Sequence, residues 1–240
     1  MHKVEEKMKK RVISLLLALV LALGLLPAVA FAAEEATAIN SADDFKSMSS
    51  DGNYILTEDI TVSTPYAKDF SGTFDGNGHT IKLEIKASGP NTGLFSRIAA
   101  GGTVKNVITA GTLDGTGKSY IGGIAGMCEG TIEYCGNTAK MIGKIGVGGI
   151  VGQIDASKAT ISNCYNAGTI EAALRQAGGI VGTARTAIIT KCVNYGTISA
   201  KSSGGGIYGG ANSSKTNISY CYWLEGKSTF AQTVGDVDSY

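Results

Sequence analysis

The chain has 240 residues, with 21 Lys and Arg against 20 Asp and Glu, a formal net charge of +1, and 34 Gly but only 3 Pro. Such a nearly equal number of basic and acidic side chains argues against a protein that binds nucleic acid through a concentrated basic surface. The scarcity of proline excludes a collagen-like chain or a proline-rich linker.

Residues 1–32 have the pattern of a secretory signal peptide. Basic side chains gather between Lys3 and Arg11, an apolar run follows, and Ala30 and Ala32 are spaced like the small residues of a cleavage site. An uncleaved membrane anchor is the alternative, because the apolar run is nearly long enough to span a bilayer. Pro27 and the small residues favour cleavage near Ala32. We therefore expect a secreted or cell-surface protein that meets a membrane only through this peptide during export.

The next segment, residues 33–90, is predicted to hold an N-terminal cap and the first coils. Ser41 followed three residues later by Asp44 is typical of a helix start. Residues 52–62 alternate between apolar and polar side chains, as a strand does. The run DGNGH at 75–79 lacks the spaced carboxylates of a calcium loop, so we interpret it as a tight turn and predict no metal site.

From residue 91 to residue 224 the chain repeats itself with a period near 28 residues. One repeated position is the apolar residue of a GGI-like motif: Leu94, Ile124, Ile150, Ile180 and Ile207. A second is an anchor position: Val107, Cys135, Cys164, Cys192 and Cys221. Three residues before each anchor lies a β-branched residue: Val104, Ile132, Ile161, Ile189 and Ile218. Six residues after it lie Leu113, Met141, Ile170 and Ile198, but then Lys227, where the pattern breaks. Several positions repeating in phase indicate a solenoid.

Short β-branched runs and frequent glycine, without helical spacing of apolar residues, favour strands in each unit. The fold class predicted is all-β: a right-handed parallel β-helix with a short N-terminal helical cap, in which equivalent residues stack about 4.8 Å apart. Gly126, Gly152, Gly182 and Gly209 recur in phase and are expected to turn the corners with positive φ. A phosphate-binding loop is the rival interpretation, but "GVGGIVG" does not fit G-x-G-x-x-G.

Two polar or reactive rows also follow from the repeat. Four cysteines occupy the anchor position. Because their Cβ vectors are parallel in a stack, disulfides between them are disfavoured, and we expect buried free thiols. Cys128 lies outside this row and is either free or a disulfide partner of Cys135. Asn137, Asn166 and Asn194 each follow an anchor cysteine by two residues. They are expected either to form a hydrogen-bonded ladder or to turn a coil corner, and a ligand-binding amide row is a further alternative.

The units "GGIVGQIDASKATISNCYNAGTI" and "GGIVGTARTAIITKCVNYGTI" resemble the GLUG repeat of bacterial exported proteins. The resemblance covers roughly residues 36–224, and it implies a β-helix on a secreted or surface-attached, often adhesin-like protein, with no catalytic residues and no cofactor. Residues 225–240 lose the repeat, as a C-terminal cap or a truncated linker would.

Three functions remain open at this point. The first is an adhesion module that contacts an extracellular glycan or a host or cell-surface protein, with Tyr165 and Tyr222 as candidate ligand-binding residues that project outward in one phase. The second is a polysaccharide lyase or hydrolase, which needs paired carboxylates; the two outward rows next to the anchor gather none. The third is a passive spacer of a larger surface protein. We predict the first, without catalysis.

Overall fold

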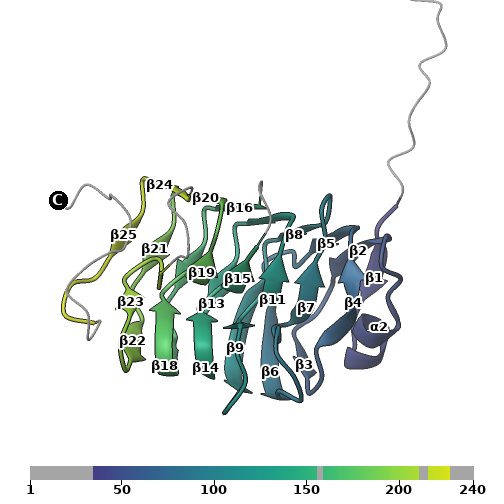
Figure 1. Cartoon of the computed structure of the whole chain (residues 1–240). Helices are drawn as coiled ribbons and strands as arrows, with labels where there is room; N and C mark the ends of the chain where they lie inside the picture. Colours follow the sequence, from purple (N-terminus) through teal and green to yellow (C-terminus); the bar gives the residue numbers. More distant parts are fainter. Residues whose placement is uncertain (1–34, 156–158, 211–215, 228–240) are drawn as a thin grey trace, which may run out of the picture. The chain divides into compact units, whose positions relative to one another are not determined.

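The computed structural model describes residues 35–155, 159–210 and 216–227 (Figure 1). The chain divides into a unit of residues 1–35 and a unit that begins at Ala36, and only the second is described below. The predicted signal peptide, residues 1–32, lies outside the described residues, as does most of the segment predicted as a C-terminal cap or linker. No helix in the described ranges has the length and hydropathy needed to cross a membrane.

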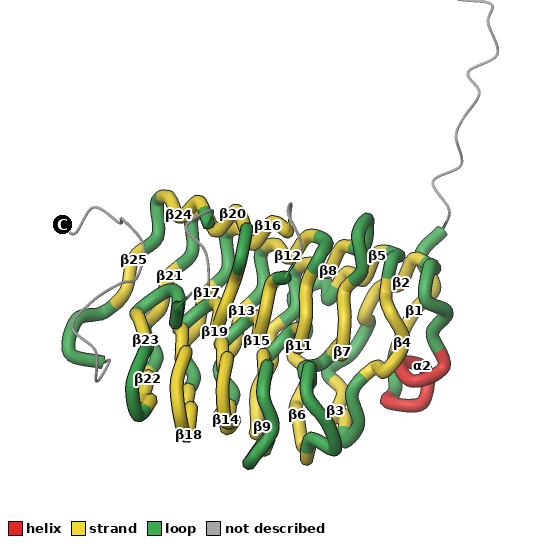
Figure 2. The backbone as a smooth tube through the Cα atoms, in the orientation of Figure 1, coloured by secondary structure: helices red, strands yellow, loops and turns green. Residues whose placement is uncertain are grey.

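Among the described residues, parallel strands form three sheets that run along the unit (Figure 2). Sheet A contains, in spatial order, β1 (Thr37–Ile39), β2 (Asn53–Leu56), β5 (Thr73–Asp75), β8 (Thr103–Lys105), β12 (Thr131–Glu133), β16 (Ala159–Ser162), β20 (Ala187–Thr190) and β24 (Asn217–Ser219). Sheet C contains β4 (Tyr66–Phe70), β7 (Phe95–Ile98), β11 (Ala125–Cys128), β15 (Val151–Ile154) and β19 (Val181–Ala184).

In each coil the strands of sheet B follow the strand of sheet A and precede the strand of sheet C. Sheet B has the largest number of strands of the three. Its strands in chain order are β3 (Ile60–Val62), β6 (Thr80–Lys86), β9 (Ile108–Asp114), β10 (Ile121–Gly122), β13 (Gly136–Asn137), β14 (Lys140–Gly148), β17 (Tyr165–Asn166), β18 (Thr169–Gly178), β21 (Val193–Asn194), β22 (Thr197–Ala200), β23 (Gly204–Gly205) and β25 (Tyr222–Trp223). Each coil passes through A, then B, then C, and pairs with the coils before and after it. The all-β parallel β-helix predicted from the repeats is confirmed.

The strand register places the repeated apolar residues directly above one another. In sheet A, Ile132 pairs with Ile161, which pairs with Ile189. In sheet B, Met141 pairs with Leu113 on one side and with Ile170 on the other. All six of these side chains are fully buried. Because a single coil cannot bury its inner surface alone, stacking of these rows is what stabilises the fold.

The predicted helix start is confirmed in α2 (Ala42–Ser47), which lies at the first end of the stack (Figure 1). The Asp44 amide donates to Ser41 Oγ at 3.1 Å, and the Asn40 amide donates to the Asp44 carboxylate at 3.2 Å. The helix buries Phe45 edge-on against Tyr66, Phe74 and Phe95. An aromatic cluster therefore covers the end of the core that would otherwise be open.

The reason we gave for the repeated glycines is wrong. Gly126, Gly152, Gly182 and Gly209 do not have positive φ; instead, a Cβ on any of them would lie 2.0–2.6 Å from backbone atoms of another coil. These positions need glycine because two backbones approach closely. Coils turn with positive φ at another row, the residue before each anchor: Asn106, Tyr134, Asn163, Lys191 and Tyr220, with φ of 53–55°.

The asparagines form the predicted hydrogen-bonded ladder, and all three are buried. Asn137 Nδ2 donates to Asn166 Oδ1 at 2.7 Å, and Asn166 Nδ2 donates to Asn194 Oδ1 at 2.7 Å. Each Oδ1 also accepts the backbone N–H two residues further on, at 3.2 Å. The ladder lies in the core at the start of sheet B and leaves no side-chain amide exposed for a ligand.

The anchor cysteines are free and buried, and so is Cys128. Their Sγ atoms lie 3.6–3.8 Å from carbonyl oxygens of the preceding coil. Burial raises the pKa of Cys128 to about 12. For Cys192, the hydrogen bond with the Cys164 thiol and then burial raise the pKa to about 12. The thiols of Cys128 and Cys192 are therefore protonated at neutral pH and act as small apolar core residues.

Candidate functional site

The two predicted ligand-binding residues lie in one outward row of sheet B, but they are not neighbours. Tyr165 pairs with Gly136 on one side and with Val193 on the other, and Val193 pairs with Tyr222. A Cβ at Gly136 would lie 2.3 Å from the Tyr165 ring, so that ring lies back over Gly136 and is half-buried. Tyr222 is 50% exposed. Val193 therefore separates the two tyrosines, and they do not form one aromatic pair.

A larger apolar surface surrounds Tyr222 on the last two described coils. We call Val193, Tyr195, Tyr220, Tyr222 and Leu224 the tyrosine face. Val193 lies in β21, Tyr222 lies in β25, and the other three lie close to these strands in the sequence. Tyr222 pairs in register with Val193, and Trp223 pairs with Asn194. The next residues along the two strands, Leu224 and Tyr195, therefore also lie side by side. Tyr220 is 71% exposed and Tyr195 is 56% exposed. Three tyrosine rings and Leu224 are thus exposed to solvent, and the half-buried Val193 lies between them.

The backbone fixes the direction of the tyrosine face. Tyr220 has φ of 53°, in the left-handed region, which is uncommon for a bulky residue. This conformation turns the coil just before the anchor cysteine, so the side chain points out of the corner. Lys191 occupies the same position one coil earlier, with φ of 54°, and places an ammonium group beside the tyrosine face.

The sequence prediction of ligand contacts did not include four residues of this face: Val193, Tyr195, Tyr220 and Leu224. The signal that could have found them is the distance from the anchor cysteine. Tyr220 precedes Cys221 by one residue, and Leu224 follows it by three, as Tyr195 follows Cys192. Outward positions therefore lie one residue before the anchor and one and three residues after it, and a search of these three positions would have collected the whole face.

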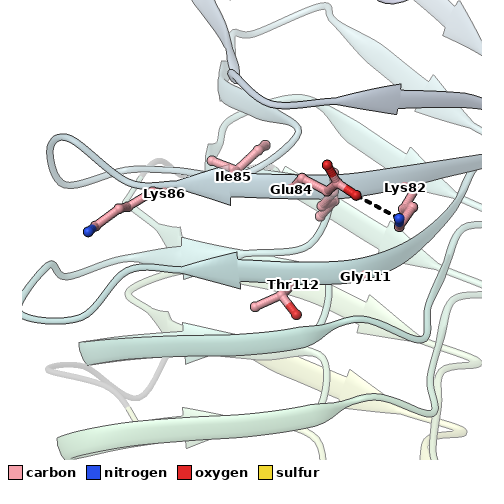
Figure 3. Close-up of a pocket in the computed structure, with 7 residues that line it drawn as sticks. Lys82, Glu84, Ile85, Lys86, Gly111 and Thr112 are labelled. Atoms are coloured by element: carbon pink, nitrogen blue, oxygen red, sulfur yellow. Dashed lines mark ion pairs between the residues drawn. The ribbon is translucent and has the colours of Figure 1, made fainter.

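A shallow hollow of 340 Å³ lies elsewhere on sheet B, where β6 and β9 pair (Figure 3). Gly111 leaves it open because it has no side chain and takes φ of 85° opposite Leu83. Lys82 and Glu84 pair across its rim, with Nζ and Oε1 2.6 Å apart, and Lys86 points away from that pair. Exposed charges that neutralise one another make this hollow a poor candidate for a binding site.

Several carboxylates in the described ranges are bound by cations or by backbone donors. Arg97 donates to both Asp69 and, at 2.8 Å, Glu129. Burial alone would raise the pKa of Asp75, but hydrogen bonds from Asn106 and the Asn77 amide, with the Lys105 charge, lower it overall. The pKa of Asp59 is also lowered, chiefly by the Thr80 backbone N–H. A general acid for sugar chemistry needs the opposite shift, a raised carboxyl pKa.

Comparison with known proteins supports the repeat assignment. Residues 143–171 match the GLUG motif, which confirms the resemblance for that unit. The chain is 32% identical over 169 residues to Halomucin from Haloquadratum walsbyi, covering 59% of this chain but only 2% of Halomucin. A crystal structure named "putative immunoglobulin A1 protease", from Bacteroides ovatus, has a similar fold, with a TM-score of 0.60 and 22% identity over 85% of this chain and 80% of that one. At that identity the likeness shows the fold alone.

Proposed function

We propose that this chain is an extracellular β-helical module that adheres to glycans or proteins through its surface and catalyses no reaction. The GLUG motif and the similarity to Halomucin support a surface or secreted protein. The signal-peptide pattern of residues 1–32 supports export. A module of a larger surface assembly is also consistent with the small share of Halomucin that the chain spans.

The observation that carries the proposal is the tyrosine face. A spacer needs only a hydrophilic surface, whereas exposed apolar side chains that cluster on one surface mark an interaction site. Tyrosine rings can stack on the apolar faces of sugars while their hydroxyls stay hydrated. Tyr165 and Tyr222 remain proposed ligand contacts, the first at the edge of this face and the second within it.

The alternative of a polysaccharide lyase or hydrolase is disfavoured by the carboxylates. The described aspartates whose pKa departs from the ordinary value are Asp44, Asp59, Asp75 and Asp114, and in each the pKa is lowered. Such groups stay ionised and cannot donate a proton to a leaving group near neutral pH. The proposal therefore assigns no catalytic residue.

The test is a retention assay with the purified full-length protein. It is incubated with immobilised plant, bacterial and host polysaccharides and glycoproteins, and both retention and released oligosaccharides are measured. We expect retention without products. Tyr220→Ala and Tyr222→Ala should each weaken retention about threefold to tenfold, the loss of one aromatic contact.

The matched control is Tyr134→Ala, because Tyr134 is exposed and occupies the same left-handed position as Tyr220, on a coil outside the tyrosine face. It should leave retention unchanged. New oligosaccharide products would overturn the non-catalytic assignment. Absence of retention on every material would favour the spacer.

A further inference from the structure

A polar groove of 270 Å³ lies where sheet B turns into sheet C, and it crosses three successive coils. Its polar lining residues are Tyr120, Gln153, Asp155, Arg175, Gln176 and Arg185. The volume falls near the lower end of the range for small-molecule pockets, about 300 Å³, so the groove suits a small ligand such as a single sugar ring. None of these residues belongs to the tyrosine face.

Next to the groove, one coil has glycine where its neighbours have large side chains. Tyr120, Gly146 and Gln176 occupy equivalent positions on three successive coils. This follows from the register, because the next residues along the chain pair with one another: Ile121 with Val147, and Val147 with Ala177. All three of the row residues take left-handed φ, at 65°, 67° and 63° along the row. A Cβ at Gly146 would lie 2.7 Å from the Tyr120 ring. The Tyr120 ring therefore lies over Gly146, in the space that a side chain there would fill, and forms one side of the groove.

A β-bulge brings a charge to this groove. In the pairing of β14 with β18, Gly143 pairs with Ala172, but Ile145 pairs with Arg175, so β18 carries one extra residue. Bulges redirect the side chains that follow them and are frequent next to functional sites. The Arg175 side chain is exposed and has no ion pair or hydrogen bond with any residue that the structure describes. Asp155, by contrast, pairs with Arg185 at 3.1 Å. The groove thus keeps one positive charge that no carboxylate neutralises.

Two side-chain amides face the same space without protein partners. Gln153 and Gln176 are half-buried, and within the described part of the chain their amide groups make no hydrogen bond. Each amide can donate two hydrogen bonds and accept others. Gln176 is held in place by its backbone, whose N–H donates to Ser203 O at 2.7 Å. Because this part of the backbone is fixed, only the side-chain rotamer of Gln176 needs to be ordered when a hydroxyl group binds.

We propose that this groove binds the carboxylate-bearing ring of an acidic saccharide, a uronate-type sugar. Arg175 binds the carboxylate through its planar guanidinium, Gln153 and Gln176 bind ring hydroxyls, and the Tyr120 ring contacts the apolar face. One unpaired arginine beside Asp155 matches a single negative charge better than a doubly charged phosphate. The inference rests on the proposed glycan-contact function, and it names a sugar class that the tyrosine face does not select.

The experiment compares a charged probe, trigalacturonic acid, with its uncharged methyl ester, which keeps the sugar rings and their hydroxyl groups. Each is titrated into the full-length protein at low ionic strength, and binding is measured by calorimetry. We expect the acid to bind at least about tenfold more tightly than the ester, the worth of a charge-assisted hydrogen bond. Arg175→Gln should remove that preference, whereas Lys46→Gln, an equal loss of charge on the exposed surface of α2, should not.

Gln153→Met provides a second variant that keeps the charge and the side-chain length. It should weaken acid and ester alike, because it removes hydroxyl contacts and not the charge. Equal affinity for acid and ester, or a preference that survives Arg175→Gln, would overturn the inference, as would no binding of the acid. None of these results would test the proposed adhesion function itself. That function is tested independently by whether Tyr220→Ala reduces retention in the panel assay.

Discussion

The asparagine ladder yields the sharpest test of the packing argument. In Asn166→Ala the middle amide of the row disappears. Asn166 Oδ1 accepts from Asn137 Nδ2 at 2.7 Å and from the Gly168 amide at 3.2 Å. Both donors are buried, and removal of the acceptor leaves one N–H of Asn137 and the N–H of Gly168 without partners.

The magnitude follows from these two donors. Each buried donor left unsatisfied costs about 1–3 kcal/mol, so the substitution should lower the free energy of unfolding by about 2–6 kcal/mol. Asn194 Oδ1 contributes little to this loss, because it still accepts the Gly196 amide at 3.2 Å. The total is comparable to a sizeable part of the net stability of a domain.

The control is Thr109→Val at the first end of the same row. Thr109 Oγ1 donates to Asn137 Oδ1 at 2.9 Å, and valine keeps its shape. Asn137 Oδ1 still accepts from the Ala139 amide, so no donor is orphaned, and the loss should be about 1 kcal/mol. Equilibrium urea unfolding followed by circular dichroism measures both. Equal losses in the two variants would refute the reasoning that orphaned donors dominate.

Three further predictions test other parts of the fold. Gly149→Ala should destabilise by about 3 kcal/mol, because its Cβ would lie 2.2 Å from the Gly179 carbonyl oxygen, while Gly89→Ala, with open space around it, should be near neutral in the same unfolding assay. Ser41→Ala should cost about 1 kcal/mol by removing the helix cap, measured likewise. The Cys192 thiol, with its pKa raised from 9.0 to about 12, should resist iodoacetamide at pH 8 in the native protein and react once unfolded, as read by mass spectrometry.

The raised thiol pKa also sets a pH dependence with a definite sign. Above pH 9 the unfolded chain releases protons that the folded chain still holds, so unfolding becomes more favourable as the pH rises. The stability contributed by Cys192 is complete below about pH 9 and is lost by about pH 12. Urea midpoints measured between pH 7 and pH 11 should therefore fall only at the alkaline end; a flat profile would contradict the burial of neutral thiols.

Much of the fold could be predicted because the repeat determines it. Once Ile132, Ile161 and Ile189 are recognised as one position, parallel stacking follows, and so do the buried rows. The role of the repeated glycines could not be predicted in the same way. Whether glycine serves positive φ or close backbone approach depends on the neighbouring coil, which the sequence of one coil does not contain. Gly152 illustrates this, since a Cβ there would meet the Tyr120 backbone at 2.4 Å.

The surface was less predictable than the core for a related reason. Tyr165 and Tyr222 share a phase, but only the register shows that Val193 lies between them. The groove depends on one extra residue in β18, which changes the spacing from Ile170 to Ile180 to ten residues, against nine from Met141 to Ile150. That irregularity is visible in the sequence. Its consequence, the redirection of Arg175, requires the paired strands.

The asparagine ladder also has a direction. Every amide donates toward the later coil, from Asn137 to Asn166 and from Asn166 to Asn194, and Thr109 begins the series. At the next coil the register partner of Asn194 is Trp223, whose ring nitrogen is only a donor and cannot continue the chain of acceptors. The row of hydrogen bonds thus begins at Thr109 and ends at Asn194. If a coil paired with the wrong neighbour, an asparagine would lie opposite Thr109 or Trp223 where the native stack has another asparagine. The row therefore favours one order of stacking of the coils.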